Sequence, residues 1–453
     1  MLKGILSYGV VEGVSKGLNK LTFLLLPLLL LVDEVGKIGL IVAMELILPL
    51  ILFLGLERAV LRFYSDTKDK NIFRSTIFIV NTCVHVLLLF VIMIVYLISP
   101  SNSFFGLEYF PDLFLIVILV YLQGNNLIAL NMYRVDSMHK QYFKFRLIFQ
   151  ILKILLVIVG IYFTGSFYAY LFGAILSNLI LIWFNRKMIY STSARKEFNK
   201  STLLSLLAFS WPFIFHGVAG NLLGNADKFI LEQYLSLTEV GQYTFIYAIA
   251  SSMSFAYIGI SVYIEPLIYK QENELKRNLL LNKFLMYSLS TGLLALIILS
   301  LIGEFLLAYI YEDQYIEVSY LIPLLASGFL ALPFYLKSNY TLIYRKHSLS
   351  IATISIITSV LNIVLNIVLI PYYGILAAVW VTIFSYLIQA CIFTIVSLRS
   401  VIKIDFFYFV FLSVFILLYA FQLINLHLFG LAVLVLIFMI HISLKKGKLI
   451  NEI

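Results

Sequence analysis

The sequence predicts an all-α integral membrane protein with about fourteen transmembrane helices. Of its 453 residues, 62% are hydrophobic and only 12% are charged, whereas a soluble domain is about 25% charged. A chain this apolar cannot cover its surface with polar groups in water, and in a bilayer only helices or closed barrels satisfy the backbone. Its apolar runs are long and continuous and do not alternate, which excludes barrel strands.

The apolar runs give the limits of these helices. A membrane-crossing helix needs about 20 mostly apolar residues, and the runs of this length are joined by short connections that leave no room for a soluble domain. The first run carries three charged residues and has no signal-peptide cleavage site, so we expect a permanent helix. The expected spans are 8–31, 37–57, 75–98, 111–132, 145–163, 167–185, 203–226, 239–262, 283–309, 318–344, 349–370, 374–397, 405–424 and 428–444.

The charged residues of the connections predict the orientation. Lysine and arginine gather in alternate loops, with four or five of them in each of the segments 58–74, 134–146, 186–200 and 270–283. The opposite loops are acidic and contain only Lys37 and Lys228 as cations. By the positive-inside rule both termini are expected in the cytoplasm. The net charge of +9 then reflects topology and anionic lipid, and no nucleic-acid partner is predicted.

A short repeat predicts two related halves. The segments 34–36 and 239–241 both read Glu-Val-Gly, and each lies in an acidic-side turn before the next span. At the same offset, two lysines of the first span align with two asparagines of the seventh. Halves of this kind usually hold a substrate site between them. The predicted parts are two pseudo-symmetric six-helix bundles, 1–190 and 200–400, followed by two extra helices and a cytoplasmic tail, 401–453.

Ionisable residues within the spans are the candidate site residues, because each costs about 2.5–3.5 kcal/mol to insert. Lys20 lies about twelve residues, or ~18 Å, into its predicted span, so we expect it near the midplane facing a hydrated cavity. A cationic interior suits an anionic substrate, and phosphate is the obvious candidate. The substrate-binding candidates are Lys16, Lys20, Lys153, Lys337, Asn221 and Asn225, and the coupling or structural acid candidates are Glu12, Glu45 and Asp227.

Each candidate also has a structural interpretation. Lys153 and Lys337 lie within about two turns of a cytoplasmic end and can extend to the headgroups. Glu12 and Lys16 can form a structural pair, being one helical turn apart. No histidine in the spans has companions at metal-ligand spacing, so no metal is predicted. Motifs for nucleotides, dinucleotides, serine hydrolases and zinc proteases are absent, so we expect neither an ATP-driven pump nor an enzyme, and no cofactor.

Three segments resemble the polysaccharide-transporter branch of the superfamily that also contains MATE drug exporters and the lipid II flippase MurJ. The seventh-helix region of Wzx-type O-antigen flippases is similar to FSWPFIFHGVAGNLLGNADKFIL (209–231) with the turn that follows it. The family's second-helix end resembles LGLERAVLRFY (54–64). Its eleventh and twelfth helices resemble VLNIVLNIVLIPYYGILAA (360–378). The similarity covers residues 1–400.

The resemblance implies a flippase of the bacterial inner membrane. It implies two six-helix lobes around a cavity that opens alternately to each side. The implied substrate is an undecaprenyl-pyrophosphate-linked oligosaccharide, moved to the outer leaflet for O-antigen, capsule or exopolysaccharide. Membrane lipids and a polysaccharide polymerase are the implied partners. Many members look twelve-spanned, and the two extra helices depart from that pattern. The family has no strict set of substrate residues, so the site candidates rest on membrane depth.

Three other functions are alternatives to the flippase. A cation-coupled MATE-like exporter of drugs or small solutes is the main alternative, but its substrates are usually cationic and the cations within the spans argue against it. A polysaccharide polymerase or glycosyltransferase would be expected to carry a large external loop or a carboxylate-rich cytosolic segment. A scaffold would not need charges at the midplane. The sequence does not specify the sugar composition of the substrate, the coupling ion, the oligomeric state or the role of the last two helices.

Overall fold

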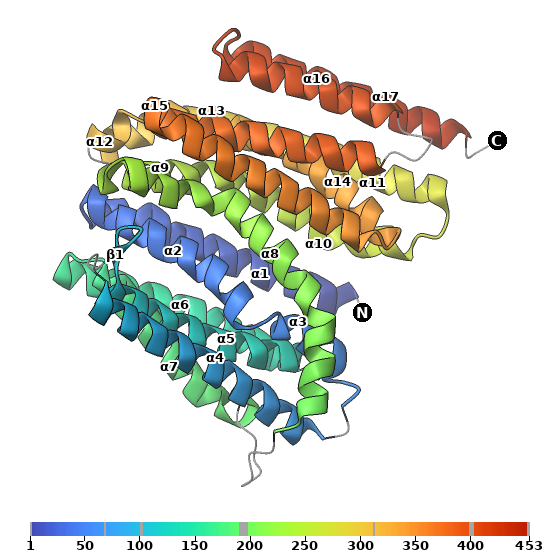
Figure 1. Ribbon diagram of the computed structural model, residues 1–453. Coiled ribbons are helices and arrows are strands. Elements are labelled where there is room, and N and C mark those ends of the chain that lie inside the picture. Colours follow the sequence, from blue (N-terminus) through green and yellow to red (C-terminus); the bar gives the residue numbers. More distant parts are fainter. Residues whose placement is uncertain are drawn as a thin grey trace. The chain divides into compact units, whose positions relative to one another are not determined.

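The computed structural model describes residues 2–67, 69–99, 103–136, 138–189, 198–310, 313–397 and 403–450. Nearly all of these residues are helical (Figure 1). Within them, eight helices are long and apolar enough to cross a membrane, and shorter apolar helices accompany them. The predicted fold class, an all-α integral membrane protein with many spans, is confirmed.

Every expected span coincides with a helix or a run of helices. The elements up to residue 189 are α1 (Leu2–Leu25), η1 (Leu26–Leu28), α2 (Val32–Leu52), α3 (Leu56–Phe63), α4 (Lys70–Ile98), β1 (Ser103–Phe104), β2 (Leu107–Glu108), η2 (Tyr109–Leu113), α5 (Phe114–Val135), α6 (His139–Thr164) and α7 (Tyr168–Ile189). The later elements are α8 (Lys200–Tyr234), α9 (Leu237–Ala250), η3 (Ser251–Met253), α10 (Ser254–Lys270), α11 (Glu274–Ile310), α12 (Asp313–Ile316), α13 (Leu321–Phe329), α14 (Leu332–Tyr344), α15 (Ser348–Ser397), α16 (Lys403–Ala420) and α17 (Leu426–Ile450).

Two of the boundaries that differ from the expectation have a clear backbone cause. The second span ends at Leu52, because Leu54 and Gly55 have φ angles of 52° and 69° and this left-handed conformation stops a helix. The short helix α3 then follows. The spans expected at 349–370 and 374–397 form one element, α15, which bends at Gly374 (φ 57°, ψ −138°) just after Pro371. Proline has no backbone N–H to donate, so the bend falls where the sequence predicts a break.

The chain forms two compact units, Leu18–Thr244 and Met1–Gly17 with Phe245–Ile453. The first contains most of α2–α8, and the second contains the elements from α10 onward. In the second unit, α10, α11 and α14 share a core that includes Ile268, Phe284 and Tyr340. Here α17 packs on α11, and α16 packs on α15 (Figure 1). The lobes at 1–190 and 200–400, with the segment 401–453, remain a prediction from the repeat.

In the first unit, glycines allow helices to approach closely. A Cβ atom on Gly124 of α5 would lie 1.4 Å from the ring of Phe53, so only glycine fits against this ring. A Cβ on Gly173 of α7 would lie 2.9 Å from the backbone nitrogen of Val157 in α6. Close backbone approach at small residues is the usual way that helices associate in a membrane.

The two turns of the sequence repeat contact each other within this same unit. A Cβ on Gly36 would lie 2.2 Å from the carbonyl oxygen of Leu237, and a Cβ on Gly241 would lie 2.1 Å from the carbonyl oxygen of Val32. The repeat relates these two contacts. Gly36 faces Leu237, which lies four positions before Gly241, and Gly241 faces Val32, which lies four positions before Gly36. The Thr238 hydroxyl also donates to Asp33 Oδ1, and these residues are 205 positions apart. The ends of α2 and α9 therefore meet in a pseudo-symmetric contact.

We expect Gly241→Val to lower the midpoint of thermal unfolding of the purified protein. The added side chain would press on a backbone oxygen that cannot rotate away, and overpacking of this kind costs about 1–3 kcal/mol. The matched control is Gly220→Val in α8, where a Cβ meets nothing within 4 Å. Equal unfolding midpoints for the two variants would contradict the close contact.

Candidate functional site

A buried ion pair joins two of the candidate residues. Lys153 Nζ of α6 lies 3.6 Å from Glu45 Oε2 of α2, and the two side chains are 9% and 8% exposed. Gln123 Nε2 of α5 donates to the same carboxylate oxygen at 2.8 Å. The Lys153 ammonium also donates to the Tyr170 hydroxyl of α7 at 3.1 Å. Four helices of the first unit thus meet at one neutral cluster, which we call the Glu45–Lys153 cluster.

This geometry bears on the interpretation of Lys153 as a residue that extends to the headgroups. The side chain does not extend to the headgroups, because it is buried and points at Glu45. Its charge is already compensated by a carboxylate, so it adds no net positive charge for an anion to meet. Glu45 Oε1 has no hydrogen-bond partner among the described residues, so the carboxylate keeps one acceptor unused.

Helix α8 contributes the second group of candidates. Asp227 accepts a hydrogen bond from the Tyr243 hydroxyl and another from the backbone nitrogen of Lys228. Lys228 Nζ donates to Asn225 Oδ1 at 3.2 Å. The side-chain amides of Asn225 and Asn221 donate to backbone oxygens of their own helix. Asp227, Lys228 and Asn225 are all buried.

Lys20 belongs to the same neighbourhood. Its ammonium group is close enough to that of Lys228 for the two to repel each other. Lys20 is partly buried and lies five residues before the last residue of α1, Leu25. Because α1 begins at Leu2 rather than at residue 8, Lys20 lies nearer one end of its helix than we expected. With Asp227 included, the charges here sum to about +1 if all three groups are ionised.

The remaining candidates lie apart from this group or outside what is described. Lys16, one turn before Lys20 on α1, is exposed. The side chain of Glu12 lies outside the described residues. Lys337 of α14 is buried in the second unit and donates to Asn282 Oδ1 of α11 at 2.5 Å, so it does not extend to the headgroups either.

Other asparagines join helices through their side-chain amides. Asn126 of α5 donates to the side-chain and backbone oxygens of Asn178 in α7, both at 3.0 Å. In the second unit, Asn362 donates to Ser385 across the bend of α15, and Asn366 donates to Asn362. These amides hold helices together and are already engaged in the structure.

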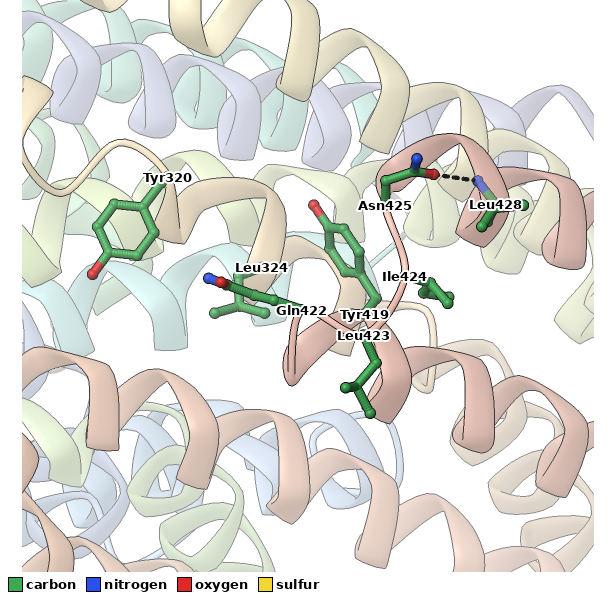
Figure 2. A pocket seen from close by; sticks show the side chains of 8 residues that line it. All are labelled: Tyr320, Leu324, Tyr419, Gln422, Leu423, Ile424, Asn425 and Leu428. Carbon is green, nitrogen blue, oxygen red and sulfur yellow. Dashed lines mark hydrogen bonds between the residues drawn. The ribbon is translucent and has the colours of Figure 1, made fainter.

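A pocket of about 480 Å³ lies in the second unit, where the α16–α17 turn meets the start of α13. Tyr320, Tyr419, Gln422 and Asn425 supply its polar groups (Figure 2). Asn425 Oδ1 accepts from the backbone nitrogen of Leu428 and so caps α17. None of the lining residues is charged, so this pocket offers no countercharge to an anionic group.

Lys228 is among the polar residues of the seventh span, but the sequence analysis counts it as a loop cation and leaves it out of the site candidates. The structure places it within α8, six residues before Tyr234. Continuing the apolar periodicity of the span past residue 226, through Phe229, Ile230 and Leu231, would have included it. The partners Gln123, Tyr170 and Asn282 carried no such signal, because neutral polar residues are common in membrane helices and only the fold brings them to a lysine.

The many helices that are long and apolar enough to cross a membrane define a polytopic membrane protein. The model of the family described as "Polysaccharide biosynthesis protein" matches residues 1–272, more than half of the chain. The chain therefore belongs to the polysaccharide biosynthesis protein family. A comparison with curated protein sequences finds no match.

Solved transporter structures share the fold. A lipid II flippase MurJ in an inward closed conformation is 14% identical, with 96% of this chain and 98% of that chain covered and a TM-score of 0.68. An inward-facing multidrug resistance MATE family transporter of the MOP superfamily is 13% identical over 84% and 93% of the two chains, with a TM-score of 0.62. The MATE transporter DinF-BH is 13% identical over 89% and 96%, also with a TM-score of 0.62. At these identities the likeness shows the fold alone.

We expect the two charges of the Glu45–Lys153 cluster to be coupled in stability. Lys153→Met and Glu45→Gln should each lower the midpoint of thermal unfolding, because removing one partner of a buried ion pair costs about 3–5 kcal/mol. The double variant should recover part of the loss, since it leaves no unpaired charge. Lys140→Met, at an exposed position of α6, is the control. Additive losses in the double variant would contradict the pairing.

Proposed function

We propose that this protein is a flippase for lipid-linked oligosaccharides. It moves undecaprenyl-pyrophosphate-linked repeat units from the cytoplasmic to the outer leaflet of the bacterial inner membrane, for export as O-antigen, capsule or exopolysaccharide. Membership of the polysaccharide biosynthesis protein family supports a role in this process. The fold supports transport by alternating access, in which the protein opens first to one side of the membrane and then to the other.

The observation that carries the proposal is the buried polar cluster of α8, in which Lys228 Nζ donates to Asn225 Oδ1 at 3.2 Å and Asp227 lies next to Lys228 in the chain. Lys20 of α1 is near enough to Lys228 for their charges to interact. An anion bound here would meet ammonium groups from two helices. A pyrophosphate suits the position because it carries several acceptor oxygens, and hydrogen bonds between ionised partners are about twice as strong as neutral ones. Asp227 limits the excess charge, which favours release of the anion after transport.

The assignment of roles follows from this pair. Lys20 and Lys228 meet the pyrophosphate, and Lys16 extends the cationic face of α1 by one turn. Asn221 and Asn225 provide polar side chains along α8 for the linked sugars or phosphates. Lys337 provides a further polar contact in the second unit. Glu12, Glu45 and Asp227 are the candidates for ion coupling, and Lys153 acts through its pairing with Glu45. No catalytic role is proposed for any residue.

The alternative is a cation-coupled exporter of drugs or small solutes, which the likeness to MATE transporters favours. The net positive charge around Lys20 argues against cationic drugs as cargo. We also propose that both termini are cytoplasmic, on the basis of the loop charges. We propose that a polysaccharide polymerase on the outer side of the membrane uses the translocated repeat units.

Deletion of the protein from its host should trap lipid-linked oligosaccharide in the inner leaflet and abolish surface polysaccharide. The measurement is the accessibility of the lipid-linked sugar to an impermeant modifying reagent in intact spheroplasts, together with surface polysaccharide content. A complemented strain is the control. Unchanged surface polysaccharide in a strain with no second flippase would refute the proposal, and increased drug sensitivity would support the exporter.

Lys20→Gln should reduce transport strongly while leaving membrane abundance unchanged. The loss of a charge-assisted hydrogen bond to the pyrophosphate is worth about 1.5–3 kcal/mol, which corresponds to a roughly ten- to hundred-fold weaker interaction. Lys20→Arg should retain part of the activity, because it keeps the charge. The matched control is Lys37→Gln, near the start of α2. Full transport by Lys20→Gln at normal abundance would remove Lys20 from the site, and loss of abundance would make its role structural.

A further inference from the structure

A second site is suggested by a groove between α6 and α7. The groove has a volume of about 410 Å³, within the range of about 300–1,000 Å³ that ligand pockets usually have. Gly160 of α6 and Gly173 of α7 both line it. A Cβ on Gly160 would lie 3.1 Å from the Cβ of Ala169. The two glycines let α6 and α7 approach each other closely here.

The sides of the groove are apolar and open. Leu156 of α6 and Phe172 and Leu176 of α7 line it, and the last two are 56% and 46% exposed. In a chain that spans a membrane, exposed apolar side chains of this kind face lipid. The groove therefore offers a place for an acyl chain, and the remaining question is which headgroup lies at its polar end.

The polar end lies at the turn between the two helices. Thr164, Ser166 and Tyr168 line the groove here. The Thr164 hydroxyl donates to the carbonyl oxygen of Gly160 at 2.9 Å, so it can only accept further hydrogen bonds. Ser166 Oγ accepts from the backbone nitrogen of Tyr168, so its hydrogen is available to a phosphate oxygen.

The charges around this end are mainly negative. Glu34 Oε2 accepts from the backbone nitrogen of Phe167 at this turn, and Asp112 Oδ2 accepts from the backbone nitrogen of Glu108. All three carboxylates are near enough to Tyr168 to act on its hydroxyl. One cation is near, because Lys37 Nζ lies 4.5 Å from the centre of the Phe167 ring. Three carboxylates against one ammonium leave the end of the groove negative. Asp112 is buried, so Glu34 and Glu108 are the carboxylates that a headgroup can reach.

We propose that this groove binds a phospholipid with a primary-amine headgroup. One acyl chain lies in the groove along Leu156, Phe172 and Leu176. The phosphate accepts from the Ser166 hydroxyl, and the ammonium is directed to the carboxylates beside Tyr168. An ammonium has three hydrogen-bond donors that these carboxylates can accept. A choline headgroup has none, and an anionic headgroup would be repelled. The site is independent of the transported substrate.

The test measures binding of spin-labelled lipids to the purified full chain in phosphatidylcholine nanodiscs. Phosphatidylethanolamine should be retained at least three-fold more than phosphatidylcholine or phosphatidylglycerol with the same acyl chains. Leu176→Trp fills the groove and should abolish this preference. The matched control is Leu179→Trp, an equally exposed leucine one turn further along α7 that does not line the groove.

Two further variants test the headgroup. Glu108→Gln removes an exposed carboxylate and should reduce the preference for phosphatidylethanolamine about two-fold, since exposed ion pairs contribute about 0.2–1 kcal/mol. Thr164→Lys adds a cation at the polar end of the groove and should abolish the preference. Glu317→Gln, an exposed acid of the second unit, is the control. Stronger retention of phosphatidylglycerol, equal retention of all three lipids, or a preference that survives Leu176→Trp would each overturn the proposal.

Discussion

Polar groups inside a membrane protein must find their partners within the protein, and this constraint governs most of the structure. No water in the bilayer core replaces a missing hydrogen bond. The cluster of Glu45, Lys153, Gln123 and Tyr170 meets the constraint with four side chains from four helices. The ion pair constrains α2 against α6, because a shift of either helix by a turn would leave a buried charge alone.

The same constraint applies to the other buried lysines. Lys153 and Lys337 have partners that hold them in the interior. Lys228 donates to Asn225 and lies next to the buried Asp227 in the chain. Each of these ammonium groups therefore meets polar groups inside the protein.

The spans could be predicted from the sequence because the bilayer imposes one length and one composition on every crossing helix. The break at Pro371 and Gly374 was also predictable, since proline cannot donate in a helix. The pairing of Lys153 with Glu45 was not, because 108 positions separate them and depth alone suggests either a cavity or the headgroups. The early end of α2 was missed because the run stays apolar through Leu54 and the turn depends on two φ angles.

The contact between the two repeat turns limits how this protein can evolve. Gly36 and Gly241 each face a main-chain oxygen of the other turn. A side chain that clashes with another side chain can be accommodated by shortening the second residue. A main-chain oxygen is present whatever residue occupies the position, so no substitution at Val32 or Leu237 would make room for a larger residue at either glycine. Second-site suppressors of a change at Gly36 or Gly241 should therefore arise by shifting whole helices and not by trimming the residue in contact.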